Sequence, residues 1–136
     1  MNPLESLYIV EQELYKARMM SNISLNEIKN SKERLDLDAV YNIEGHKEYM
    51  IESLVKYANV LGIHLYLDDQ PVENLSDIGK ILRVKREQAG LTKIGTYPEV
   101  YILPKTISRI ESGKNYRKST FVKYSSYFDV HFTIKD

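Results

Sequence analysis

The feature that most constrains the fold of this chain is an internal repeat. Residues 35–67 align with residues 102–134 at a constant offset of 67, with eight identical positions, and most other positions exchange similar side chains. Upstream the offset becomes 68, where residues 10–24 align with residues 78–92. A repeat of this length predicts two similar structural units in one chain, rather than one fold with unrelated halves.

The repeat predicts the domain boundaries. We expect one unit at residues 1–70 and a second at 71–136, with a linker over residues 68–77, where Pro71 and several helix-capping residue types occur. In the first unit we expect helices over residues 4–20 and 50–61, and two more that begin at Ser24 and Asp36. In the second unit we expect helices over residues 78–88 and 117–128, and two more that begin at Thr92 and at Leu103-Pro104.

Each unit ends in a segment in which apolar and polar residues alternate, at 63–67 and at 130–134. Period-two alternation with β-branched and aromatic residues predicts strands. Because a lone strand leaves its backbone groups unpaired, we expect the two strands to pair with each other. The expected fold class is mainly α, with one short strand at the end of each unit.

The two units differ in charge. Residues 1–70 hold seven Lys/Arg and twelve Asp/Glu, whereas residues 71–136 hold twelve and seven. The net charge of zero for the whole chain therefore conceals an acidic first half and a basic second half. A basic half commonly faces a polyanion such as nucleic acid, and two differently charged solvent faces are the alternative.

Composition and motifs argue against several classes of protein. The chain has no cysteine, which excludes disulfides and fits a reducing, cytoplasmic location. It shows neither a signal peptide nor an apolar stretch long enough to span a bilayer, so we expect no membrane partner. No P-loop, GxGxxG motif or set of catalytic residues is recognisable. We therefore expect that the protein is not an enzyme and that it binds neither a cofactor nor a metal ion.

One string in the second unit carries a functional signal. AGLT at residues 89–92 is followed, thirteen residues later, by TISRIESGK at residues 106–114. This pattern resembles the Cro-like and Xre-like helix-turn-helix repressors over about residues 78–128, and it reaches the first unit only through the repeat. The resemblance implies two tandem, lambda-repressor-like helix-turn-helix bundles and a sequence-specific, duplex-DNA-binding transcriptional regulator of repressor type.

The helix containing TISRIE has two faces. Ile107 and Ile110 are three residues apart and are expected to point inward, whereas Thr106 and Arg109 lie on another face and Lys105 projects from the helix start. The resemblance implies that Lys105, Thr106 and Arg109 read base edges in the major groove. It also implies phosphate contacts from Lys93, Ser112, Gly113, Lys114, Arg117 and Lys118.

The resemblance implies further structural features. Arg86 and Glu111 correspond to a partly buried ion pair that ties two helices together, and Arg18 and Glu44 repeat it in the first unit. The terminal strands are similar to those of certain toxin–antitoxin repressors, in which a strand pairs across a dimer. The chain thus resembles such a dimer fused into one polypeptide.

The first unit departs from the pattern. Its residues at the reading positions are Asp38, Ala39 and Asn42, and an acid there has the wrong sign for DNA. We expect this acidic unit to associate with itself, bind a protein partner or complete the fold. The alternative function for the whole chain is a protein-binding module, such as an antitoxin that neutralises a toxin, with DNA binding secondary.

Three other sets of residues permit two interpretations. In residues 93–105, Gly95 and Pro98 disfavour a helix interior, and the β-branched and tyrosine content suits a strand equally well. Unless Pro98 falls in its first turn, we expect a second helix here to be short or distorted.

The matched His64 and His131 favour hydrogen-bonded histidines over a metal site. The tyrosines recurring at matched positions favour packing or hydrogen bonds at the edge of the bundle over stacking on nucleic-acid bases; they are Tyr49, Tyr57, Tyr116 and Tyr124.

Overall fold

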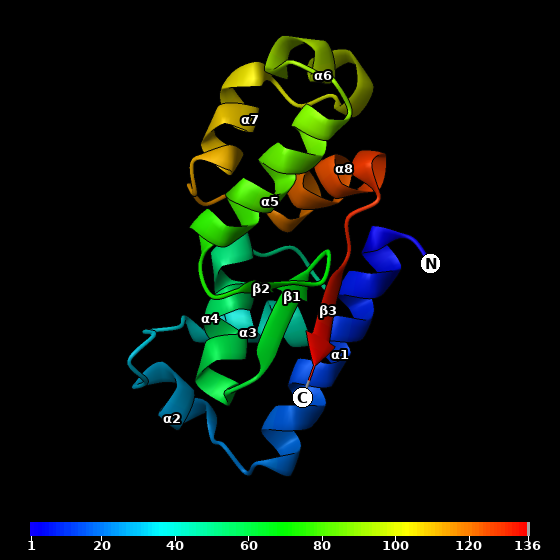
Figure 1. Ribbon diagram of the computed structural model, residues 1–136. Coiled ribbons are helices and arrows are strands. Elements are labelled where there is room, and N and C mark those ends of the chain that lie inside the picture. The colour runs from blue at the N-terminus through cyan, green and yellow to red at the C-terminus, as the bar shows by residue number, and fades with distance from the viewer. Residues whose placement is uncertain (136) are drawn as a thin grey trace.

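The computed structural model describes residues 1–135, which form eight helices and three strands (Figure 1). The helices are α1 (Pro3–Met20), α2 (Leu25–Lys29), α3 (Leu37–Glu44), α4 (Ile51–Leu61), α5 (Leu75–Gln88), α6 (Lys93–Val100), α7 (Pro104–Glu111) and α8 (Lys118–Phe128). The strands β1 (His64–Leu67), β2 (Gln70–Val72) and β3 (Phe132–Lys135) form an antiparallel sheet in the order β2-β1-β3. The predicted mainly helical class is confirmed. None of the helices in residues 1–135 is both long enough and apolar enough to cross a membrane.

Local signals in the sequence set the ends of several helices. Ser24 and Glu27 form a capping box at the start of α2, and the Thr92 side chain accepts a hydrogen bond from the Gly95 amide at the start of α6. Asn22 follows α1 and Gly90 follows α5, and both adopt the left-handed conformation that ends helices. These predicted boundaries are confirmed.

The helix bounds follow the two offsets of the repeat. The helices α3 and α4 have the same lengths as α7 and α8, and the offset of the downstream block relates their bounds. In the upstream block, where the offset is 68, α1 and α5 end at matching residues, and α2 and α6 begin at matching residues. The other helix bounds differ: α6 extends to eight residues where α2 has five, and α1 has 18 residues where α5 has 14.

The two halves meet through a symmetric exchange of backbone hydrogen bonds. Met50 and Arg117, which are counterparts in the repeat, form an antiparallel bridge. On one side of this bridge the Ile51 amide donates to the Tyr116 carbonyl at 2.8 Å. On the other side the Lys118 amide donates to the Tyr49 carbonyl at 2.9 Å. Each half therefore donates to the other half the same backbone hydrogen bond that it accepts from it, as in a two-fold dimer.

The same exchange caps two helices across the junction. Neither α4 nor α8 has a side-chain cap from its own N-cap residue. Instead the Asn115 side chain accepts from the Glu52 amide of α4 at 3.1 Å, and the Glu48 side chain accepts from the Ser119 amide of α8 at 3.0 Å. Because Glu48 and Asn115 are counterparts, each half supplies the cap that the other half lacks.

The sheet continues this symmetry. Strands β1 and β3 pair antiparallel, and Tyr66 lies opposite Thr133, its own counterpart in the repeat. Leu65, Leu67 and Phe132 are buried on one face of the sheet, which fixes the register because a shift by one residue would expose them. The predicted pairing of the two terminal strands is confirmed.

The prediction of a linker at residues 68–77 is wrong. Asp68 and Asp69 both have positive φ and form the two-residue turn of a β1–β2 hairpin. Strand β2 lies at the edge of the sheet, where Pro71 is tolerated because one side of the strand needs no donor. Asn74 and Asp77 then form a capping box that begins α5 three residues earlier than predicted.

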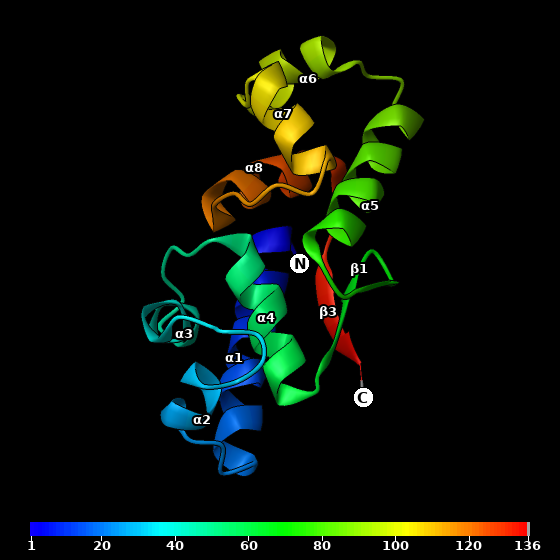
Figure 2. The same cartoon turned by 90° about the vertical axis from the view of Figure 1, so that its left-hand side faces the viewer.

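The arrangement of the elements interlocks the halves. Strand β3 from the end of the chain lies between β1 and α1, and α8 also contacts α1. At one end of the molecule are α6 and the first turn of α7, far from α2 at the other end, and the quarter-turned view in Figure 2 shows the same separation. The buried residues of both halves form one hydrophobic cluster.

Candidate nucleic-acid interface

Helix α7 has a buried face and an exposed face. Ile107 and Ile110 are completely buried, which anchors the helix on the core. Lys105 and Arg109 are exposed and Thr106 is half-buried, so the three residues predicted to read bases lie on the outer side of one helix. Within the residues that the structure describes, neither Lys105 nor Arg109 forms an ion pair.

The backbone amides in the first turn of α7 have no side-chain cap and can donate hydrogen bonds to an external acceptor. Pro104 occupies the first position, where its fixed φ suits a helix and its missing amide hydrogen costs nothing. Leu103 precedes it as the N-cap residue and supplies no side-chain acceptor. The remaining amides of the first turn therefore add partial positive charge beside Lys105, which favours an anion there.

An ion pair and a tyrosine fix the other end of α7. The guanidinium of Arg86 on α5 donates two hydrogen bonds to the Glu111 carboxylate, at 2.7 and 2.8 Å, and a third to the Leu91 carbonyl at 2.8 Å. The Tyr124 hydroxyl on α8 donates to the same carboxylate at 2.8 Å. The hydrogen bond to Glu111 raises the pKa of Arg86, and burial raises the pKa of Tyr124. The predicted ion pair is present and holds three helices together.

The first half repeats this arrangement. Arg18 on α1 donates to Glu44 on α3 at 2.7 and 2.9 Å, and the Tyr57 hydroxyl on α4 also donates to Glu44. Each of these residues is the counterpart of one member of the set on α5, α7 and α8. The second predicted ion pair is therefore also present.

The turn after α7 contains three of the predicted phosphate-binding residues. Ser112 and Lys114 are exposed, and Gly113 lies between them with a φ of +85°. A Cβ on Gly113 would lie 3.2 Å from the Cα of Ser76 at the start of α5. The left-handed backbone and this close approach both favour glycine here.

Helix α6 is regular despite its composition. Pro98 is its sixth residue and is tolerated in the helix interior, although it removes the hydrogen bond to the carbonyl of Ile94. Tyr101 ends the helix in the left-handed conformation. Ile94 and Tyr101 are 76% and 78% exposed, so this end of the molecule presents large apolar side chains beside the half-buried Lys93.

The prediction that Lys118 contacts phosphate is contradicted by its burial. Its ammonium group lies 2.7 Å from the Glu11 carboxylate, and both side chains are at most 10% exposed. Arg117 is exposed and forms the bridge with Met50 at the junction of the halves. Burial opposes ionisation of nearby Glu48, yet hydrogen bonds from Ser119 and the charge of Arg117 together lower its pKa.

Sequence reasoning missed the buried polar cluster around Glu11. The fully buried carboxylate of Glu11 accepts a hydrogen bond from the Tyr49 hydroxyl at 2.6 Å and lies 2.9 Å from Nδ1 of His46. Together with Lys118 these residues connect α1 to α8 across the junction. A signal was present, because Glu11 falls among the inward-facing positions of α1, where a charged residue needs partners.

The counterparts of the reading residues lie on α3. Asp36 caps this helix by accepting from the Asp38 amide at 3.2 Å. Asp38 is exposed, and Ala39 and Asn42 are half-buried. The exposed start of α3 therefore has an acid where α7 has a lysine.

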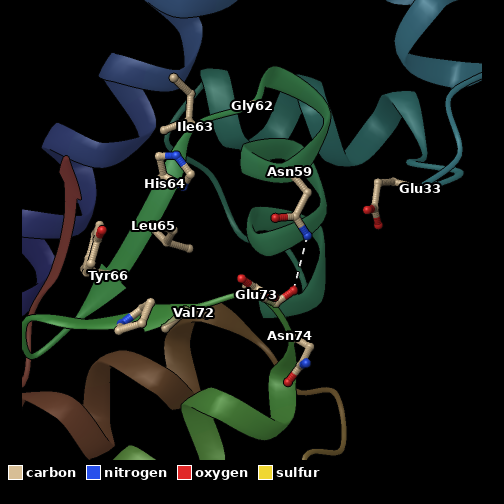
Figure 3. Close-up of a pocket in the computed structure, with 11 residues that line it drawn as sticks. Glu33, Asn59, Gly62, Ile63, His64, Leu65, Tyr66, Val72, Glu73 and Asn74 are labelled. Atoms are coloured by element: carbon tan, nitrogen blue, oxygen red, sulfur yellow. Dashed lines mark hydrogen bonds between the residues drawn. The ribbon is translucent and has the colours of Figure 1, made fainter. Parts of the chain in front are cut away.

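A hollow of about 470 Å³ lies beside the β1–β2 hairpin (Figure 3). Figure 3 shows His64 and Tyr66 on β1, with the Asn59 side chain donating to the Glu73 carbonyl at 3.2 Å. The other matched histidine, His131, instead bonds Ser6 and Asp129. Residues 1–135 contain no group of three or more side chains that could hold a metal ion.

The matched tyrosines serve packing, as predicted. All four are buried, and three of them donate to carboxylates. Tyr116 is the exception, because its hydroxyl is buried without a partner in the described residues.

Comparison with models of known protein families, with curated proteins and with solved structures gave no match for this chain.

Proposed function

We propose that this protein is a sequence-specific, duplex-DNA-binding transcriptional regulator of repressor type. In this proposal each half is a helix-turn-helix unit, and α7 of the second half enters the major groove while α6 lies across the backbone. The protein represses, or regulates its own gene, by occupying a promoter. The first half is a degenerate unit that completes the fold.

The observation that carries the proposal is the division of α7 into a buried and an exposed face. The isoleucines that anchor the helix leave Lys105, Thr106 and Arg109 on the outer side. Arg109 suits base reading because a guanidinium donates two parallel hydrogen bonds to O6 and N7 of guanine. Lys105, beside the uncapped amides of the first turn, suits a phosphate or a base edge.

Rigidity of the reading helix supports the same proposal. A recognition helix must hold its side chains in register with base pairs, so it needs fixed support from the rest of the domain. The bonds of Glu111 to Arg86 and Tyr124 provide that support at the far end of α7. Gly113 brings the following turn against α5, so that Ser112 and Lys114 lie beside the helix as phosphate contacts.

The first half lacks these properties. Asp38 at the start of α3 repels phosphate, and neither Ala39 nor Asn42 carries positive charge. One reading helix per chain predicts a short, asymmetric DNA site for a monomer, and an inverted repeat for a dimer.

The test is selection of bound duplexes from a randomised DNA pool at near-physiological salt. We expect the wild type to enrich one motif and the Lys105→Ala/Arg109→Ala variant to lose that enrichment. The matched control is Lys29→Ala/Lys32→Ala, which removes the same charge from exposed positions in the first half and should keep the motif. Absence of any motif with the wild type, or equal loss in both variants, contradicts the proposal.

A further inference from the structure

An exposed side of α1, next to its buried side, carries an apolar stripe made of Leu4, Tyr8, Tyr15 and Met19, which are 41–53% exposed. At helical spacing these four residues fall within an arc of about 60° along the whole length of the helix. In Figure 1, α1 forms one edge of the molecule, and no other element of residues 1–135 lies outside it. We call these four residues the α1 stripe.

The α1 stripe does not belong to the packing already described. The buried side of α1 consists of other residues, among them Leu7, Val10, Glu11 and Leu14. Tyr8 is held in place by stacking on the His46 ring, with 3.7 Å between ring centroids. An ordered row of half-exposed aromatic and aliphatic side chains is typical of a surface that a protein partner covers.

The spacing of the stripe is symmetric about the middle of the helix. Leu4 and Met19 lie at equal distances from the midpoint, and so do Tyr8 and Tyr15. A second copy of α1 running antiparallel therefore places Leu4 against the partner's Met19, and Tyr8 against the partner's Tyr15. Such self-complementarity is the requirement for a contact about a two-fold axis.

Charges beside the stripe favour the same arrangement. Glu5 and Lys16 lie on one flank of the stripe, about 20° apart around the helix. In an antiparallel pair of helices, equivalent flanks face each other, so Glu5 of each copy lies near the partner's Lys16. Among the described residues of the single chain, Lys16 forms one ion pair, with the exposed Glu13 at 3.5 Å, and such exposed pairs contribute little.

A groove of about 570 Å³ lies beside the first turns of α1, and the residues that line it include Leu4, Tyr8, Ile9, Glu11, His46 and Lys118. The antiparallel arrangement brings the partner's Met19 to this groove. Met19 is 53% exposed in the single chain, and methionine side chains adapt to irregular apolar spaces.

We infer that the α1 stripe is a homodimer interface, in which two copies of this chain pack α1 against α1 in antiparallel orientation about a two-fold axis. The inference is independent of DNA binding. A helix of 18 residues is about 27 Å long, so the contact is small and we expect association at about micromolar concentration.

The first test is sedimentation of the DNA-free protein over a range of concentration. We expect the wild type to pass from a monomer of 15.9 kDa to a dimer. Tyr15→Glu should raise the dissociation constant at least tenfold, because it places two like charges in the apolar contact. Val84→Glu is the matched control, since Val84 is 47% exposed on α5 and should leave association unchanged.

The second test checks orientation. The variants E5K and K16E each place like charges opposite one another in a homodimer, so each alone should associate more weakly than the wild type. Mixed together, the two variants should form a heterodimer. In it the two lysines of the E5K chain lie near the two glutamates of the K16E chain, so every charge at these positions faces an opposite charge. A wild type that stays monomeric, a Tyr15→Glu variant that dimerises as tightly as the wild type, or a mixture without heterodimer overturns the inference.

Discussion

The polar centre of the first half and the matching position of the second half are built differently. In the first half Glu11 on α1 gathers His46, Tyr49 and Lys118. The residues at the matching positions are Gly79, Gly113 and Tyr116 in the second half and Ile51, the counterpart of Lys118, in the first. One half therefore contains a buried carboxylate with three partners, and the other contains two glycines and a buried hydroxyl that has no partner among residues 1–135.

The difference changes how closely the helices approach. A Cβ on Gly79 would lie 2.6 and 2.7 Å from the carbonyl oxygens of Glu111 and Ile110, so α5 packs directly on the backbone of α7. In the first half the Glu11 side chain occupies the matching place and reaches Lys118 on α8. The repeat thus keeps one fold with two solutions: a close backbone contact that supports α7, and a charged cluster that ties the halves together.

The largest effect is expected from breaking the charged cluster. Glu11→Gln and Lys118→Met should each lower the free energy of unfolding by about 3–5 kcal/mol, because each leaves a buried charge without its partner. The double variant should cost clearly less than the sum of the two. Urea unfolding measures all three, with the exposed Lys123→Met on the same helix as the control. Additive losses would show that the two charges do not interact.

A matched pair of tyrosines sharpens the comparison. Tyr49→Phe should cost about 1.5–3 kcal/mol, because the Tyr49 hydroxyl donates to a buried carboxylate. Tyr116→Phe should be neutral or stabilising, because it removes a buried hydroxyl that has no partner in the described residues. Chemical denaturation of the two variants side by side gives the answer. Equal losses would mean that the two halves do not differ in this way.

The close contact at Gly79 gives a somewhat smaller effect. Gly79→Ala should destabilise the protein by about 1–3 kcal/mol, because α5 must move away from α7 to admit the new Cβ. Gly45→Ser is the control: Gly45 has almost the same φ and ψ as its counterpart Ser112, which already carries a side chain. Thermal or urea unfolding measures both, and an unchanged stability of Gly79→Ala would refute the close contact.

The smallest effect concerns pH. Burial raises the pKa of Tyr116, so the folded state retains a proton that the unfolded state loses at about pH 10. The stabilisation is complete below the pKa of the unfolded state and is lost as pH rises through that of the folded state. Tyr116→Phe should therefore lose less stability than the wild type between about pH 9 and pH 11. Urea midpoints across that range measure the difference, and parallel curves would contradict it.

The sequence predicted the elements that local signals specify. The repeat, the capping residues and the alternating termini located the helices and the pairing of β1 with β3. Strand β2 was missed because Pro71 is typical of a linker and an Asp-Asp turn is a weaker hairpin signal than Asn-Gly. In α6, Pro98 disfavoured a helix that the tertiary packing nevertheless completes.

The candidate interface was predictable only in part. The spacing of Ile107 and Ile110 correctly divided α7 into buried and exposed faces, and the two arginine–glutamate pairs are where the resemblance implied. Lys118 was assigned to phosphate through the resemblance, because it follows closely on the turn after α7. Its burial depends on Glu11, which lies in the first helix of the chain, and no local pattern reports such a distant contact.

The place of β3 in the sheet has a consequence for the order of folding. Residues 132–135 lie between β1 and α1, so the part of α1 that contacts β3 and the edge of β1 that pairs with β3 lack this partner until residue 135 has been synthesised. Contacts between such distant parts of a chain form slowly, because a long loop must close first. The acidic half is therefore made first but completed last, and during synthesis its exposed surface is a natural target for chaperones.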